Sequence, residues 1–445
     1  MGSRVLHRVL GLDNFEAVKA KGSYIFASTG EKLLDACGGA AVVSIGHCDQ
    51  RVIDALLDQM TTVNYCHSGM WKNQPSEQLA KILCESAGMD LCLFANGGTE
   101  AVESALKLAR QHFVESSQPE RVHFIGRHQS YHGNSIGCLA AGGHTARRGP
   151  FIPLLPHTSF HKVSPCNAYR YKHDQESDQA YVSRLKQELE DKFNELGGET
   201  VAAFIAEPVV GATTGCVPAV PGYFKAMREV CDKFGALMIF DEVMCGMGRT
   251  GRMHAWEWED IHPDIQVIAK GLSGGYAPCS AVLASARVIE PLKRGTSSFN
   301  NGFTYQNWAV GARAALEVVR IIEKDNLLEN CLEMGRLLEA RLKERIGDHR
   351  MVGNLRGRGL FWGVEFVSDR GTKEPFDPSL DVGNRVFEEV CKRKVVVYPG
   401  KGTADGVRGD HILIAPPYII TVEEIDLITG ALKDGIDAVA KDLGL

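Results

Sequence analysis

Two charged residues, Lys270 and Asp241, each come at the end of an apolar run that predicts a buried strand. Lys270 follows residues 265–269 and precedes glycines, while Asp241 ends the run 236–240. Ligands bind at the carboxyl ends of the strands of an α/β sheet. A lysine that forms a Schiff base and a carboxylate that keeps a pyridinium nitrogen protonated together suit pyridoxal 5'-phosphate. A buried ion pair without a cofactor is the alternative interpretation.

A glycine turn connects the predicted strand 91–95 to the predicted helix 100–112 through Ala-Asn-Gly-Gly-Thr-Glu. A helix N-terminus attracts anions through its free N–H groups and its dipole, and Thr99 adds a hydroxyl. The turn alone fits an ordinary threonine cap equally well. Beside a lysine–carboxylate pair, phosphate binding at Gly98 and Thr99 becomes the better interpretation.

Two further motifs follow predicted strands. Tyr131, in Ser-Tyr-His-Gly, can lie flat against a planar heterocycle, although such a tyrosine is more often a core aromatic. Glu207, in Ala-Glu-Pro-Val, either contacts the cofactor or substrate region or pairs with an arginine, and the sequence leaves both open.

Two other patterns resemble a dinucleotide-binding motif and a metal site, and we expect neither function. Residues 246–251 match GxGxxG, but no strand directly precedes them and no convincing helix follows, so we expect a loop beside Asp241. The pairs His128/His132 and His157/His161 have i, i+4 spacing, but nearby glycine and prolines predict loops there. No metal site is expected.

Composition and net charge limit the classes of protein to which this chain can belong. A net charge of −6 argues against nucleic acid or an anionic membrane as partner, and no apolar run is long enough to span a bilayer. Thirteen cysteines without CxxC pairs indicate a reducing compartment. We expect a cytoplasmic protein; a short N-terminal stretch with two arginines and no acids leaves a mitochondrial location open.

The chain divides into three zones. Residues 66–315 alternate strand-like runs with amphipathic helices, which predicts an α/β fold with a mostly parallel sheet covered by helices. Residues 1–65 contain short strands, and residues 316–445 contain long helices flanking a short sheet. The polar stretch 169–196 predicts a surface excursion with a helical second half.

Taken together, the motifs resemble the class III aminotransferases, which are pyridoxal-phosphate enzymes of the aspartate-aminotransferase fold (fold type I). The resemblance covers nearly the whole chain and rests on six ordered motifs: Asn-Gly-Gly-Thr-Glu-Ala from 96, Tyr-His-Gly from 131, Ala-Glu-Pro-Val from 206, Phe-Asp-Glu-Val from 240, Ala-Lys-Gly from 269 and Phe-Thr-Tyr from 303. It implies a large domain of residues 66–315 and a smaller α+β domain built from 1–65 and 316–445.

The resemblance also implies roles for single residues. Lys270 would bind the cofactor as an imine and shuttle a proton, and Asp241 would hold the pyridine nitrogen. Thr304 would reach the phosphate of the neighbouring subunit, which implies a homodimer with shared active sites. The remaining implied cofactor contacts are Gly98, Thr99, Tyr131, His132, Glu207 and Val243. The implied substrate contacts are Tyr24, Trp71 and Arg408; for Arg408, a surface charge paired with a nearby aspartate is an equal alternative.

The expected reaction is amino-group transfer between a primary amine or amino acid and a 2-oxo acid such as pyruvate or 2-oxoglutarate. Fold alone does not determine function, so an aminomutase or a decarboxylase is an alternative. A catalytically silent binding relative is a third, but such a relative should have lost Lys270 or Asp241, and both are present.

Overall fold

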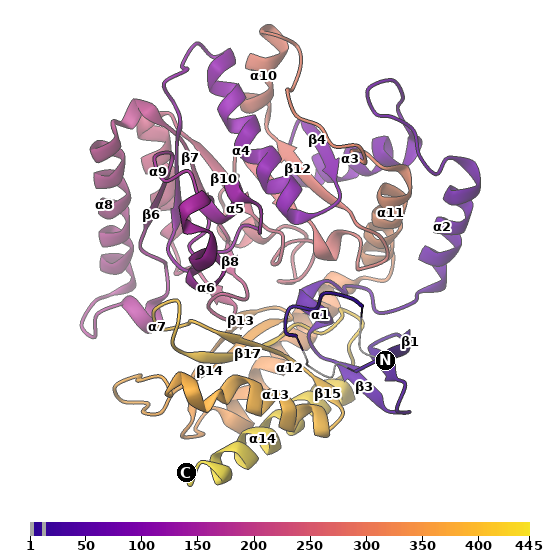
Figure 1. Cartoon of the computed structure of the whole chain (residues 1–445), viewed down its shortest axis with the longest axis vertical. Helices are drawn as coiled ribbons and strands as arrows, with labels where there is room; N and C mark the ends of the chain where they lie inside the picture. Colours follow the sequence, from indigo (N-terminus) through magenta and orange to yellow (C-terminus); the bar gives the residue numbers. More distant parts are fainter. Residues whose placement is uncertain (1–3, 11–14) are drawn as a thin grey trace.

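A seven-stranded sheet lies at the centre of the larger part of the molecule (Figure 1). The computed structural model describes residues 4–10 and 15–445. The strands follow the spatial order β4 (Leu91–Ala95), β12 (Ser280–Ala284), β11 (Ile265–Ile268), β10 (Leu237–Asp241), β7 (Val201–Ala206), β5 (His123–Arg127) and β6 (Phe160–Val163). Strand β12 is antiparallel to β11 and β4, and the other pairs are parallel. The expected mostly parallel sheet is confirmed.

Helices cover both faces of this sheet, and the strand residues alternate between them. On β10, Leu237 and Ile239 pack with α4 (Gly98–Glu115) and α10 (Ala286–Arg294). Met238 and Phe240 point to the opposite face, toward the helices α8 (Asp178–Leu196) and α9 (Tyr223–Phe234). Apolar residues on both faces of one strand are the pattern of a sheet buried on both sides.

A second unit combines the two ends of the chain. Strands β1 (Ala17–Lys21), β2 (Tyr24–Ala27) and β3 (Lys32–Asp35) are joined by the C-terminal strand β15 (Val395–Val396), which pairs with β3 in parallel. A four-stranded antiparallel sheet contains β13 (Val352–Arg358), β14 (Phe361–Phe366), β17 (Asp410–Ile414) and β16 (Tyr398–Lys401). One apolar core joins these strands to α12 (Leu327–Ile346), α13 (Val382–Lys392) and α14 (Val422–Asp442).

The chain passes from the first unit into the second within a single helix. Helix α11 (Ala309–Lys324) runs through residues 315 and 316 without a break, and α2 (Gln50–Thr62) packs against it. The exact division at 65 and 315 therefore stays a prediction.

The GxGxxG loop lies between the units as a buried turn. Arg249 within it is 1% exposed and donates hydrogen bonds to the carbonyls of Leu360 and Val43, which belong to the C-terminal and N-terminal segments. These contacts give the loop a packing role.

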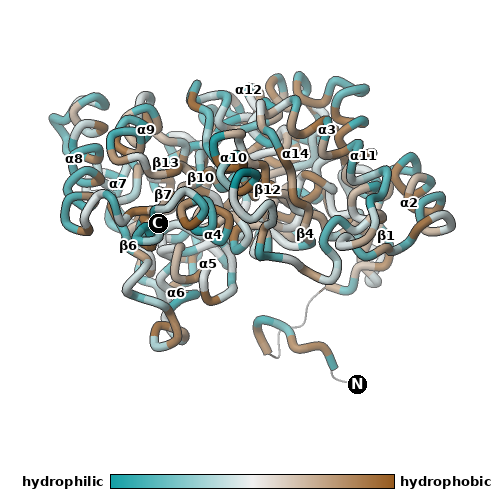
Figure 2. Tube along the Cα trace, turned by 90° about the horizontal axis from the view of Figure 1, so that it is seen from above, coloured by the Kyte–Doolittle hydropathy of each residue, from teal (hydrophilic) through white to brown (hydrophobic). Residues whose placement is uncertain are grey.

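The segment 169–196 is only partly a surface excursion. Helix α8 buries one face and exposes the other, so hydrophilic and hydrophobic stretches alternate along it in Figure 2. The short helix α7 (Ala168–Tyr171) instead turns inward, where Arg170 pairs with the fully buried Glu365. The expectation was wrong for α7 because a charged side chain can be buried when its partner is buried too.

Within residues 4–10 and 15–445, no helix is long and apolar enough to cross a membrane. Residues 1–3 and 11–14, which include part of the stretch considered as a targeting segment, lie outside the described residues.

Candidate active site

A cavity of about 1100 Å³ lies where the strand ends of the large sheet face the second unit. The loops that follow β4, β5, β7, β10 and β11 all contribute to its lining, as expected for the carboxyl edge of a parallel sheet. The second unit contributes Tyr398, Lys401 and the loop residues Gly406 and Val407.

Lys270 and Asp241 both line this cavity but do not pair with each other. Asp241 Oδ2 lies 2.7 Å from His132 Nδ1, and Asp241 Oδ1 accepts from the backbone N–H of Val243 at 3.0 Å. Among the described residues no ion pair joins Asp241 to Lys270, so the geometry does not favour the interpretation as a simple buried ion pair. Burial lowers the pKa of Lys270, and the charges of Asp241 and Glu207 oppose this shift.

The backbone at Lys270 is also unusual. Its φ of 47° lies in the left-handed region, which non-glycine residues adopt at a cost and which occurs often at functional sites. The conformation begins a short 3₁₀ turn, Lys270–Leu272, directly after β11.

The N-terminus of α4 contributes to the cavity lining, where a helix presents its free N–H groups and the positive end of its dipole. Gly97 is the N-cap, and Gly98 and Thr99 line the cavity. A Cβ atom at Gly98 would lie 2.9 Å from Val243 Cγ1, so a side chain there would collide with the cavity wall. Thr99 Oγ1 accepts from the backbone N–H of Asn134 at 3.1 Å, which leaves the hydroxyl proton for another acceptor.

Tyr131, His132 and Val243 complete the walls around the centre of the cavity. His132 is buried, and its Nε2 atom has no hydrogen-bond partner in the part of the chain that the structure describes. Buried polar atoms without partners are rare and point to a missing group or water.

Glu207 also faces the cavity. Its carboxylate accepts from the backbone N–H groups of Tyr131 and Gly211 at 3.3 and 3.4 Å. No arginine side chain pairs with its carboxylate among the residues described, although Arg127 donates to its backbone carbonyl at 2.6 Å. Burial, together with the charge of Asp241, raises the pKa of Glu207. The position of Glu207 therefore fits a contact with the cofactor or substrate region better than a pair with an arginine.

Four sequence-predicted residues lie elsewhere, and none of them lines the cavity in the described part of this chain. Thr304 is exposed, and its backbone carbonyl accepts from Tyr65. Trp71 is 65% exposed, and Tyr24 lies in β2 under the ammonium of Lys32. Arg408 is about half exposed and pairs with Asp405 at 2.7 Å and with Glu374 at 3.0 Å, which is the geometry of its surface-charge alternative.

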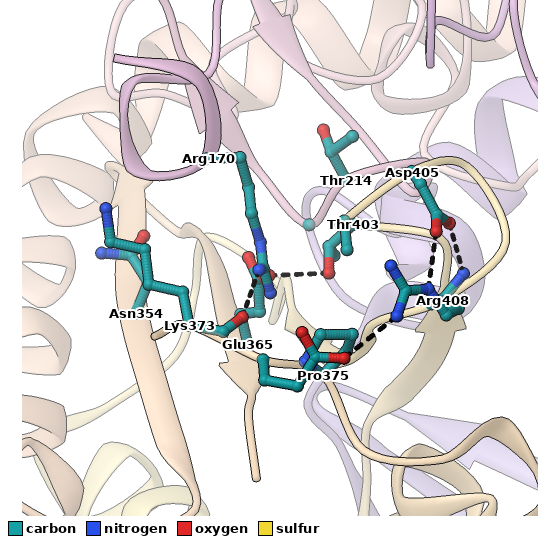
Figure 3. A network of polar contacts seen from close by, with 12 residues as sticks. Arg170, Thr214, Asn354, Glu365, Lys373, Pro375, Thr403, Asp405 and Arg408 are labelled. Carbon is teal, nitrogen blue, oxygen red and sulfur yellow. Dashed lines mark hydrogen bonds and ion pairs between the residues drawn. The ribbon is translucent and has the colours of Figure 1, made fainter. Parts of the chain in front are cut away.

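A polar network that no local sequence pattern predicts anchors the loop 402–409 (Figure 3). The Thr403 hydroxyl donates to Glu365 at 2.7 Å, and Arg170 donates to the same carboxylate oxygen at 2.6 Å. From the other side, Gln129 Nε2 donates to the carbonyl of Gly402 at 3.0 Å. The Tyr171 hydroxyl lies 2.8 Å from both Gln129 Oε1 and the Ala404 carbonyl.

These residues fit pyridoxal phosphate on structural grounds. The helix N-terminus suits its phosphate, Asp241 suits a protonated ring nitrogen, and Lys270 supplies the amine. The unsatisfied Nε2 atom of His132 and the cavity that Val243 and Tyr131 both line suit a polar ring. A mostly parallel sheet that presents this set at its carboxyl edge defines a pyridoxal-phosphate enzyme of fold type I.

Comparisons with known proteins specify the family. The model of the family "Aminotransferase class-III" matches residues 11–436. An aminotransferase from Schizosaccharomyces pombe is 48% identical over 422 residues, which cover 94% of this chain and 92% of that protein. A taurine–pyruvate aminotransferase from Bilophila wadsworthia is 32% identical, over 99% of this chain and 97% of its own length. A pyridoxal-phosphate-bound amine transaminase from an uncultivated Pseudomonas species has a TM-score of 0.92 at 30% identity, with 99% of both chains covered.

The chain belongs to the class III aminotransferases, and it is a pyridoxal-phosphate-dependent enzyme that transfers an amino group from an amine donor to a keto acid. The comparisons favour transamination over the aminomutase, decarboxylase and silent-relative alternatives.

Proposed function

We propose that Lys270 is the residue that holds the cofactor covalently and moves the proton during transamination. When bound, pyridoxal phosphate supplies an electron sink for negative charge on the donor carbon. After the incoming amine has displaced it, Lys270 Nζ takes the proton from the donor carbon that bears nitrogen and later returns it. The single observation that carries this role is the meeting of Lys270 and Asp241 in one cavity without an ion pair between them.

The other cavity residues act on binding and orientation. Asp241 keeps the ring nitrogen protonated, and His132 holds the Asp241 carboxylate in place at 2.7 Å. Gly98 and Thr99 bind the phosphate, while Val243 and Tyr131 contact the two faces of the ring. Glu207 contributes to the polar lining between cofactor and substrate.

We further propose that the acceptor is pyruvate or 2-oxoglutarate and that the working unit is a homodimer in which Thr304 of each subunit completes the other's phosphate site. The taurine–pyruvate aminotransferase from Bilophila wadsworthia supports pyruvate. The exposure of Thr304 outside the cavity of its own chain is consistent with a role across an interface. A cytoplasmic location also belongs to this proposal.

Borohydride reduction followed by peptide mapping tests the assignment of Lys270. The adduct is expected on the peptide that contains Lys270, and it should be absent from Lys270→Ala. An adduct on another lysine would overturn the assignment.

The substrate proposal is tested with a panel of amines added to the cofactor-loaded enzyme. A productive donor should remove the absorbance of the bound cofactor, and pyruvate or 2-oxoglutarate should restore it. Loss without recovery by either 2-oxo acid would reject both proposed acceptors.

A further inference from the structure

We propose that Arg147 is an anion-recognising residue of the substrate pocket and that it selects amine donors with a carboxylate remote from the reacting amino group. This role rests on the proposed function, in which the donor displaces Lys270 inside the same cavity.

Arg147 is held in the cavity wall by an aromatic ring. It lies on the short helix α6 (Thr145–Arg148), and its guanidinium carbon lies 4.9 Å from the centre of the Tyr131 ring. Both residues line the cavity. A flat, weakly hydrated guanidinium stacks well on an aromatic face, and this contact fixes its position while its edge N–H groups stay available.

Within the residues that the structure describes, Arg147 makes no ion pair. Lys401, which also lines the cavity, pairs with Asp381 at 2.5 Å, and Arg408 pairs with Asp405 of its own loop and with the more distant Glu374. A half-buried cation without a carboxylate partner is costly to keep in a folded protein. Its retention in a cavity wall is explained if a ligand supplies the negative charge.

The carboxylates of the cavity lining do not compensate Arg147. The lining includes two, Asp241 and Glu207. Asp241 is bound to His132, and the Glu207 carboxylate accepts from backbone N–H groups. The wall around Arg147 is therefore positively charged.

A neighbouring histidine responds to this positive charge. Burial, and then the charge of Arg147, lower the pKa of His144 to about 4, so this neighbour is neutral near pH 7. Arg147 and Lys270 both line the same cavity of about 1100 Å³, so one small molecule can engage both.

The chemistry of the two residues then defines the donor. The planar guanidinium can bind both oxygens of a carboxylate, while the donor's amino group takes the place of Lys270 on the cofactor and releases the lysine amine. A donor with an amine at one end and a carboxylate at the other satisfies both sites. An alkylamine of equal length provides the reacting amino group but leaves Arg147 without a counter-charge.

Matched donors test this inference. The rate and KM of the amine half-reaction are measured by cofactor absorbance for ω-amino carboxylates and for n-alkylamines of the same carbon number. Arg147→Gln should lower kcat/KM for the carboxylate donors roughly 10- to 100-fold, mainly through KM, because a charge-assisted hydrogen bond is lost. The alkylamines should change less than about threefold, and Arg147→Lys should retain part of the carboxylate preference. Arg320→Gln, at an exposed arginine of α11 that pairs with Glu317, removes a matched positive charge outside the cavity lining and should leave the ratio unchanged.

A binding measurement separates this inference from the proposed function. Butyrate, which has no amino group, is titrated calorimetrically into the cofactor-loaded wild type and Arg147→Gln. Binding to the wild type that weakens at least tenfold in the variant supports the inference even if no amine reacts, an outcome that would count against the proposed function alone. Equal butyrate binding, or equal losses for carboxylate and alkylamine donors, would overturn the role of Arg147. Thermal unfolding of each variant checks that the fold is kept.

Discussion

The Asp241 carboxylate is held by two contacts, one with the His132 ring and one with the backbone N–H of Val243. Both come from residues that also line the cavity, so the carboxylate is oriented before any ligand binds. Preorganised charge of this kind accounts for much of the rate acceleration in enzymes, because little reorganisation remains during the reaction. Asp241 is therefore the best residue at which to test the electrostatics of the site.

Asp241→Asn is expected to keep the fold and lose most of the activity. A neutral amide does not hold a proton on the ring nitrogen, so stabilisation of the donor carbanion should fall by roughly 4 kcal/mol, or about a thousandfold in rate. Single-turnover measurements with one donor give the rate, and the cofactor content of the purified variant serves as the control. Turnover near that of the wild type would contradict the assigned role.

At the scale of elements, the short helix α7 and the loop 402–409 connect the two units beside the cavity. Tyr171 reaches from α7 to Gln129 and to the loop carbonyl of Ala404. Gln129 lies two residues before Tyr131, and Val407 of the loop lines the cavity. The position of the substrate-side wall thus depends on hydrogen bonds that link α7, the loop after β5 and the loop after β16.

Tyr171→Phe should weaken this link without touching the cofactor. Loss of the hydroxyl leaves partners short of a hydrogen bond, at a cost of about 1–2 kcal/mol. We expect KM to rise several-fold for both donor and acceptor, with an unchanged absorbance of the bound cofactor. Tyr169→Phe is the matched control on the same helix, because its hydroxyl has no hydrogen-bond partner among the described residues. If both variants behave alike, the link does not position the wall.

Strand β17 contains a fully buried histidine that should make stability depend on pH. Burial lowers the pKa of His411 to about 4 from an ordinary value of 6.5. Between these two values the unfolded chain binds the proton and the folded chain does not, so the free energy of unfolding falls as the pH drops from 6.5 to 4. The contribution of His411 over this window is about 3 kcal/mol.

Denaturant unfolding of the wild type and His411→Asn at several pH values tests this expectation. The variant should be less stable at pH 7, and the difference between the two proteins should shrink toward pH 4. A difference that stays constant with pH would show that His411 does not titrate in this window.

For the whole molecule, the proposed role of Thr304 predicts more than one chain per active unit. Eight of the residues assigned to the cofactor line one cavity, whereas Thr304 lies outside it and is exposed. If Thr304 serves the phosphate site of a second copy, then each subunit contributes to two sites. Closed two-fold symmetry would make both sites equivalent.

Mixed dimers test this arrangement. Lys270→Ala and Thr304→Glu chains should each be inactive alone, the second because its carboxylate repels the phosphate. After subunit exchange in equal amounts, activity should return to about a quarter of that of the wild type, since half the dimers are mixed and each contains one intact site. The absence of activity after demonstrated exchange would argue against a shared site.

Local patterns in the sequence were enough to place Lys270, Asp241 and the glycine turn before α4 at the ends of their strands. Hydrophobic periodicity and glycine turns are local properties, and parallel strands necessarily bring their carboxyl ends to one edge. The capping box of Thr421 and Glu424 at the start of α14 is also local, because it needs only a threonine followed by a glutamate three residues later. Each of these features depends only on residues that are close together in the sequence.

The segments that meet at the cavity from distant parts of the chain could be identified only from the three-dimensional packing. Nothing local indicates that Arg147 stacks on Tyr131, or that the C-terminal loop 402–409 is held by Gln129 and Tyr171. The same is true of the parallel pairing of β3 with β15, which joins opposite ends of the chain. Such contacts depend on how the two units pack, and the free energy of packing is summed over many side chains that no short pattern contains.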